Sequence, residues 1–175
     1  LGIGYQLGMQ ATHSNFSGDR VSGIRRGDRD QIFFTGGLFH RRPEGGLQWA
    51  VAYDFLHDVY YETFDLSQLR AELTWVLPGR REIGFWGAFE TRRESVANST
   101  LKPNDMFAFF FRHYFSGGGE GRTWTGFTGN ADALLGADIR VPLGTSWALE
   151  NSINYLIPKE SRGASGQPQE SWGVS

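Results

Sequence analysis

The chain has 175 residues, a length that suits one domain, and its 17 Lys and Arg against 19 Asp and Glu give a formal net charge of −2. This balance excludes the basic surface that a nucleic-acid-binding protein needs, and the absence of Cys excludes disulfide frameworks and Cys-based metal sites. No apolar run approaches the roughly 18 residues of a membrane-spanning helix, whereas 24 Gly and 15% aromatic residues with only two Met favour an all-β chain.

Two-residue alternation of apolar and polar side chains runs through most of the chain and predicts long β-strands. In the first strand, for example, Leu7 and Met9 alternate with Gln6, Gly8 and Gln10. The predicted strands, in chain order, span about 1–12, 31–40, 47–57, 69–77, 82–91, 105–115, 122–128, 131–141 and 147–157. Residues 171–175 indicate the start of a further strand.

The connections between these strands alternate between short turns and longer polar loops. Short turns are expected at 41–46, 78–81, 116–121 and 142–146, and longer loops at 14–30, 58–65, 92–104 and 158–170, with a tight hairpin at Gly129-Asn130 as the exception. Short turns on one rim and long loops on the other are typical of an antiparallel up-and-down barrel, particularly one of the outer-membrane type. We therefore predict an all-β fold, a single meander β-barrel domain over residues 1–175 with about 8–12 strands.

One segment, 65–77, also fits a helix. Asp65 suits a helix cap, and Leu66, Leu69 and Leu73 lie at helical spacing. The neighbouring segments on both sides are predicted strands, so a strand is the favoured interpretation of this segment.

Alternation alone does not say which set of side chains faces the interior. A soluble barrel buries the apolar set, whereas a membrane barrel turns that set toward lipid and lines its lumen with the polar one. Strand length favours the membrane barrel, because about 11 residues tilted near 45° span about 25 Å, the height of an outer-membrane apolar band. Strands of soluble proteins commonly have about 5 or 6 residues.

Aromatic residues gather near both ends of the apolar face, around aliphatic midsections such as Val51, Leu73 and Ile153. Amphipathic rings sit well at the depth of lipid headgroups, so this arrangement predicts two aromatic girdles. The predicted membrane-interface aromatics are Trp49, Tyr53, Phe55, Trp75, Phe85, Phe89, Trp147 and Tyr155.

The polar face carries charges of both signs, which we expect to form ion pairs inside a small barrel. The predicted lumen-lining residues are Arg70, Glu72, Glu90, Arg112, Asp132, Asp138, Arg140 and Glu150. Barrels of about 8 strands are filled by their own side chains, and aqueous channels appear near 16 strands. We therefore expect a closed or very narrow lumen, with Trp86, Phe110, Arg112, Arg140 and Leu156 projecting inward.

Histidines at the long-loop ends of two strands leave an enzymatic alternative open. His13 lies beside Ser14, and His57 lies beside Asp58. Outer-membrane hydrolases place Ser, His and Asp near this rim, although a histidine at an interface is usually the polar tip of an amphipathic ring. No His-x-x-x-His spacing supports a metal site. We predict neither a cofactor nor enzymatic activity.

The stretch Phe127–Pro158, followed by Glu170–Val174, resembles a family of predicted barrel proteins of unknown function from planctomycete bacteria. The similarity is most specific over 127–175 and weaker over 1–60. The resemblance implies a location in the bacterial outer membrane and a further, closing strand, and it brings no catalytic residues. Because no signal peptide precedes Leu1, we also expect the chain to be part of a longer protein.

Together these features predict a bacterial outer-membrane β-barrel that acts as a structural anchor or as a narrow pore for small solutes or ions. Its partners are then outer-membrane lipid and, if the lumen is open, small solutes or ions, with no nucleic acid and with an undetermined oligomeric state. Two alternatives remain. One is a soluble, lipocalin-like barrel that binds an apolar ligand, and the other is a membrane-embedded hydrolase that uses the rim histidines.

Overall fold

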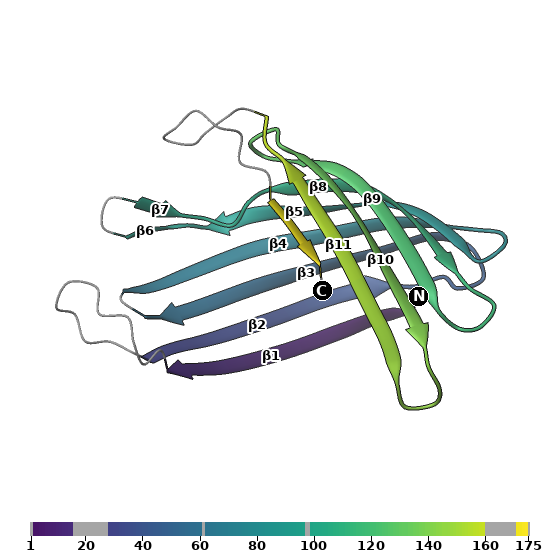
Figure 1. Cartoon of the computed structure of the whole chain (residues 1–175), viewed down its shortest axis with the longest axis horizontal. Coiled ribbons are helices and arrows are strands. Elements are labelled where there is room, and N and C mark those ends of the chain that lie inside the picture. The colour runs from purple at the N-terminus through teal and green to yellow at the C-terminus, as the bar shows by residue number, and fades with distance from the viewer. Residues whose placement is uncertain (1, 16–27, 61, 97–98, 160–170, 175) are drawn as a thin grey trace.

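The computed structural model describes residues 2–15, 28–60, 62–96, 99–159 and 171–174. Ten strands form one antiparallel sheet in which each strand pairs with its neighbours in chain order (Figure 1). These strands are β1 (Ile3–Asn15), β2 (Asp28–His40), β3 (Gly46–Val59), β4 (Thr63–Leu77), β5 (Arg81–Arg92), β8 (Met106–Tyr114), β9 (Glu120–Thr128), β10 (Ala133–Pro142), β11 (Ala148–Ile157) and β12 (Ser171–Val174). Two short strands, β6 (Glu94–Val96) and β7 (Ser99–Leu101), form a separate hairpin. Among the described residues, no helix is long and apolar enough to cross a membrane.

The antiparallel meander predicted from the sequence is confirmed. Each predicted strand corresponds to a strand of the sheet, and β12 occupies the place of the strand expected at 171–175. The registers are continuous over long distances, as between β3 and β4, which pair from Gly46 with Val76 to Val59 with Thr63. A continuous register preserves the two-residue alternation, so each face of the sheet keeps one set of side chains.

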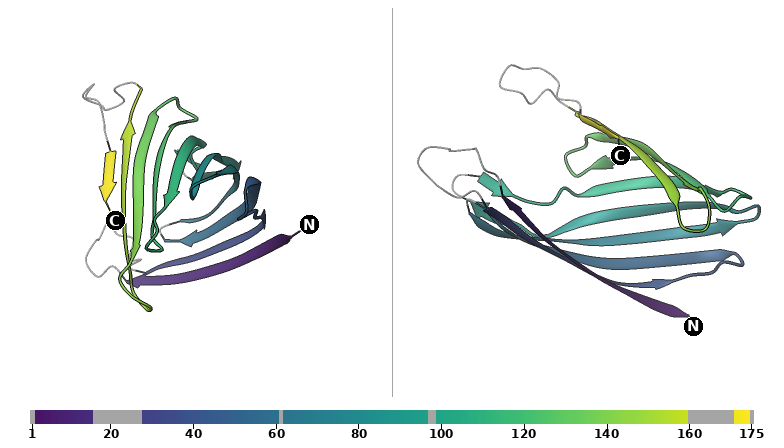
Figure 2. Two further views of the ribbon diagram at one scale, coloured as in Figure 1. Left: turned by 90° about the vertical axis from the view of Figure 1, so that its right-hand side faces the viewer. Right: turned by 60° about the horizontal axis from the view of Figure 1, so that its bottom comes forward.

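The sheet curls into a trough and does not close. Its edges are β1 and β12, and no pairing joins these two strands within the described residues. Figure 2 shows the two edges standing apart, on either side of the concave surface. β12 covers only part of β11, from Ile153 to Leu156. The described chain is therefore an open meander.

Two predicted connections and one alternative interpretation differ from the structure. The long loop expected at 58–65 is mostly strand, because β3 ends at Val59 and β4 begins at Thr63. The helix alternative for 65–77 is wrong, since β4 pairs with β3 on one side and β5 on the other. The loop expected at 92–104 contains the β6–β7 hairpin. Most of the loops expected at 14–30 and 158–170 lies outside the described residues.

Burial in this sheet is inverted relative to a soluble domain, in which apolar side chains dominate the interior. The buried apolar residues are Ala88, Ala108, Phe110 and Leu134, whereas the buried polar residues are Asp54, Asp58, Ser67, Thr74, Glu82, Thr128 and Asp132. Large apolar side chains are widely exposed, including Tyr5 and Met9 at 77% each and Trp147 at 79%. The described sheet thus protects charged groups and leaves its apolar face open.

Candidate functional site

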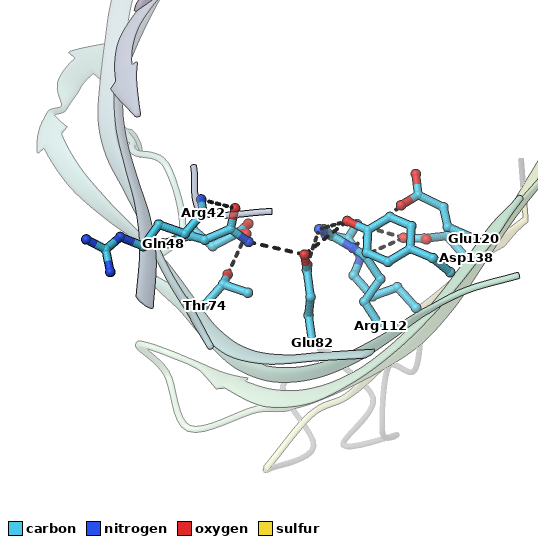
Figure 3. Close-up of polar contacts among 10 residues, drawn as sticks. Arg42, Gln48, Thr74, Glu82, Arg112, Glu120 and Asp138 are labelled. Atoms are coloured by element: carbon cyan, nitrogen blue, oxygen red, sulfur yellow. Dashed lines mark hydrogen bonds and ion pairs between the residues drawn. The ribbon is translucent and has the colours of Figure 1, made fainter. Parts of the chain in front are cut away.

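The polar side chains gather on the concave face of the sheet, and we call the strand positions on that face the inner wall. Cross-strand partners point to the same side of a sheet, so the registers link these positions from β1 to β11. Figure 3 shows Glu82 and Arg112 rising from the concave side. The predicted lumen residues on the inner wall are Arg70, Glu72, Glu90, Arg112, Asp138, Arg140 and Glu150. The remaining one, Asp132, is buried in the turn before β10.

The predicted interface aromatics lie on the opposite, outer face of the sheet. On β3, β4, β5 and β11 they alternate with inner-wall positions, and Trp147 lies immediately before β11. Trp75 and Trp147 are among the exposed large side chains, together with Tyr53 and Phe89. The other four, Trp49, Phe55, Phe85 and Tyr155, are half-buried against outer-face neighbours. Phe85 and Phe107 belong to an outer-face aromatic cluster, with ring centroids 6.4 Å apart.

Two buried aspartates on the inner wall of β3 each bind an arginine from a neighbouring strand. Asp54 accepts hydrogen bonds from Arg70 on β4, at 2.5 Å from Nε and 2.9 Å from Nη2. Asp58 accepts from Arg29 on β2, at 2.5 Å from Nη2 and 3.1 Å from Nε. Side chains that complete the two acceptor sets are Thr35 and Gln68 at Asp54, and Gln31 at Asp58. Such satisfied, charge-assisted bonds make burial of a carboxylate tolerable.

A second network surrounds Glu82 near the short-turn end of the trough (Figure 3). Arg112 donates from Nη1 to Glu82 Oε2 at 2.9 Å, and the hydroxyl of Tyr114 donates to Oε1 at 3.2 Å. Gln48, from β3, donates to the same Oε1 at 3.1 Å. Arg112 also lies 3.8 Å from a carboxylate oxygen of Glu120 on β9. These contacts connect β3, β5, β8 and β9 across the concave face.

Two further ion pairs continue the inner wall toward β11. Arg122 on β9 donates to Asp138 on β10, at 2.6 Å from Nη2 and 2.9 Å from Nε. Arg140 lies 3.1 Å from Glu150 on β11. Arg140 and Glu150, both in the predicted set, thus pair with each other, whereas Arg70 and Asp138 pair with residues outside that set.

Three inner-wall aromatic rings lie against glycines of the neighbouring strand, namely Phe39 on Gly4, Phe110 on Gly84 and Trp124 on Gly136. A Cβ placed on Gly84 would collide with the ring of Phe110, and one placed on Gly136 would collide with the indole of Trp124. Each glycine is the direct cross-strand partner of its ring. An arginine carbon Cζ lies over each of the last two rings, that of Arg112 at 5.3 Å from the Phe110 centroid and that of Arg122 at 5.2 Å from the Trp124 centroid. Guanidinium, ring and glycine thus form a stack against the wall.

The middle of the trough is a hollow of about 540 Å³. Its floor contains small side chains, among them Ala50, Ala52 and Ala88, and its sides carry Glu72, Trp86, Arg122 and other residues from seven strands. A second hollow of about 520 Å³ is lined by Glu120, Arg140 and Glu150, and both hollows share Asp138 and Ser152. The two spaces therefore adjoin along the inner wall.

Several inner-wall residues escape the sequence analysis. Asp54 has the parity of the polar set on its strand, but a single sequence does not show that Arg70 lies beside it. Glu82 and Arg122 lie in strands with aromatic residues on both faces, where the phase of the alternation is hard to assign. Arg29 lies within the loop predicted at 14–30 but belongs to β2. Knowledge of the register, rather than of composition, is needed to find these partners.

The rim histidines face outward and pair with aspartates from the adjoining strand. His13 Nδ1 lies 2.6 Å from Asp30, and His57 Nδ1 lies 2.6 Å from Asp65. Asp58, the sequence neighbour of His57, points to the inner wall and binds Arg29 instead. Among the described residues, no serine hydroxyl is hydrogen-bonded to either histidine.

The comparisons with known proteins identify a family but no function. Residues 1–175 match the family model described as "Family of unknown function (DUF6666)". No curated protein and no solved structure matches the chain. The resemblance to a family of unknown function is thereby confirmed at this level, while the bacterial source and the location that it implies stay proposals.

Proposed function

Because the chain belongs to this family of unknown function, we propose its role from its own geometry: a bacterial outer-membrane β-barrel that acts as a structural anchor or as a narrow pore for small solutes or ions. In this proposal the trough is closed into a barrel by a strand that pairs with the free edge of β1. Closure is required in lipid, because unpaired backbone groups at membrane depth cost several kcal/mol each.

The observation that carries the proposal is the inverted burial of the sheet. Charged groups such as Asp54, Asp58 and Glu82 are protected on the concave face, while the outer face exposes rows of large apolar side chains. A monomeric soluble protein rarely exposes a contiguous apolar surface larger than a few hundred Å². Apolar-out and polar-in alternation is the pattern of a membrane barrel.

The extent of the apolar rows supports the same proposal. On β1 the outer-face positions from Ile3 to Met9 are exposed and apolar, and on β3 the row runs from Leu47 to Phe55. Toward the long-loop end these rows stop at the outward pairs His13–Asp30 and His57–Asp65. A polar boundary beyond an apolar belt fits the transition from acyl chains to headgroups.

The two alternatives receive less support. A lipocalin-like barrel needs its apolar set on the concave face, but this face carries the ion pairs. A rim hydrolase needs a nucleophile beside its histidine, but His13 and His57 are hydrogen-bonded to Asp30 and Asp65, and the hydroxyl of Ser67 on β4 is bonded to that of Thr91.

The experiment is tryptophan quenching by brominated lipid after reconstitution of the full-length protein. One variant keeps Trp75 and Trp147 on or beside the outer face, and a matched variant keeps Trp86 and Trp124 on the inner wall, with the other tryptophans replaced by Phe. We expect strong quenching of the first variant and weak quenching of the second. Equal quenching, or a native protein that is soluble without detergent, would contradict the proposal.

A further inference from the structure

The charges of the inner wall are unbalanced. Its guanidiniums are those of Arg29, Arg70, Arg112, Arg122 and Arg140, and its carboxylates are those of Asp54, Asp58, Glu72, Glu82, Glu90, Glu120, Asp138 and Glu150. No Lys occurs at the described strand positions of this face. Carboxylates therefore outnumber guanidiniums on the surface that lines the proposed lumen.

Every one of these arginines is neutralised by its own carboxylate. The pairs are Arg29–Asp58, Arg70–Asp54, Arg112–Glu82, Arg122–Asp138 and Arg140–Glu150. Arg112 and Arg122 are also held flat over aromatic rings. The positive charge is thus fixed at the wall and matched locally, so it contributes little attraction for anions.

The surplus negative charge lies at Glu72, Glu90 and Glu120. Glu90 is paired with Arg93 at the long-loop rim. Glu72 accepts a hydrogen bond from the Thr74 hydroxyl at 3.0 Å, and the nearest cationic group to Glu120 is Arg112 at 3.8 Å. Glu72 lines the larger hollow and Glu120 the adjoining one. The surplus therefore faces the space that runs along the trough.

The flat rings keep this space open. Phe110 and Trp124 lie on Gly84 and Gly136, so two large inner-wall side chains cover the wall without crossing the trough. Small residues such as Ala50 and Ala52 line the same hollow. The two adjoining hollows, one lined by Glu72 and the other by Glu120, give the proposed lumen open space along the inner wall.

We propose that the barrel passes small inorganic cations in preference to anions, with Glu72 and Glu120 as the selectivity-determining residues. This inference rests on the proposed function, because it requires a closed and membrane-inserted barrel. Rings of acidic side chains select cations in channels, and a low-dielectric wall strengthens their field in a narrow lumen.

The test is the reversal potential of the full-length protein in planar bilayers under a KCl gradient. We expect small conductance steps with potassium preferred over chloride. Glu72→Gln and Glu120→Gln each lower the permeability ratio by about twofold, the effect of one carboxylate acting across several ångströms of water. Arg140→Gln frees Glu150 and changes the ratio in the opposite direction. Glu62→Gln, which removes an exposed carboxylate in the turn between β3 and β4, is the matched control and leaves the ratio unchanged.

Three outcomes would overturn the inference while the quenching experiment still shows insertion: preference for chloride, a ratio insensitive to both glutamates, or silent bilayers. Large porin-like steps insensitive to Glu72 and Glu120 would do the same. Absence of insertion in the quenching experiment would instead overturn the proposed function, and the inference with it.

Discussion

Trp124 covers Gly136 so closely that no side chain fits between them. The two residues are direct cross-strand partners on β9 and β10, and the guanidinium of Arg122 lies over the indole. Phe110 repeats the arrangement on Gly84. Phe39 lies on Gly4 in the same way, so these rings fit against the wall only where the facing residue has no Cβ.

Adding these Cβ atoms should destabilise the fold. Gly136→Ala and Gly84→Ala force the rings off the wall, an overpacking effect of about 1–3 kcal/mol in the free energy of unfolding. Urea unfolding of the detergent-folded protein measures this. A Cβ added to Gly117, in a turn, would have no neighbouring heavy atom within 4 Å. Gly117→Ala is therefore the control and should change the free energy of unfolding by less than about 0.5 kcal/mol. Equal effects at Gly136 and Gly117 would contradict the stacking.

Arginines of the inner wall should differ in their effect on stability according to the burial of their partners. The Asp54 side chain is 4% exposed, so Arg70→Ala leaves an unpaired buried carboxylate and should cost about 3–5 kcal/mol. Arg140 and Glu150 are 60% and 70% exposed, so Arg140→Ala should cost under about 1 kcal/mol. Chemical denaturation of both variants gives the comparison, and similar losses would mean that the two pairs share one environment.

Glu82 and Arg112 should be energetically coupled. Both side chains are largely buried, so removing either one leaves the other without its charge partner. Glu82 also accepts hydrogen bonds from Gln48 and Tyr114. In a double-mutant cycle with Glu82→Leu and Arg112→Leu, we expect the double variant to lose less stability than the sum of the single variants, by about 0.5–3 kcal/mol. Additive losses would show that the contact contributes nothing.

A charged substitution on the outer face should destabilise the protein more in the middle of the membrane than near its surface. Val51 is exposed in the middle of β3, and Leu47 is exposed near the short-turn end of the same strand. In a bilayer, Val51→Lys should cost about 2–4 kcal/mol, and Leu47→Lys about 0–1 kcal/mol. Folding titrations into lipid vesicles measure both. If neither substitution changes stability, the outer face is in contact with water.

Strand positions were predictable because alternation survives wherever the register is unbroken, as along β3 and β4. The helical spacing at 65–77 misleads because leucines fall on both faces of β4: Leu69 and Leu73 point outward, while Leu66 lies on the inner wall. The β6–β7 hairpin, three residues a strand, is too short for periodicity to reveal.

The inner-wall residues were predictable as a face but not as pairs. Parity alone assigns Arg70, Asp138 and Arg140 to one surface. Their partners depend on which residue lies opposite on the neighbouring strand, which is a property of register and side-chain reach. For this reason the roles of Asp54, Asp58 and Glu82, three buried acceptors, follow from the structure rather than from the sequence.

Because the strands of the sheet lie in the order of the chain, the topology also bears on how the protein folds. Each pairing in the described sheet joins successive strands, apart from that of β5 with β8, which spans the small β6–β7 hairpin. The paired strands are therefore close along the chain, and little conformational entropy is lost when the connection between them closes. Low contact order of this kind favours fast zippering from any nucleus. In the proposed barrel, the contact that seals β1 is the exception, since it joins opposite ends of the meander. Pairing of β1 with the closing strand is then the slow step of folding. Until this pairing forms, the unpaired edge of β1 is where a chaperone or another chain would bind.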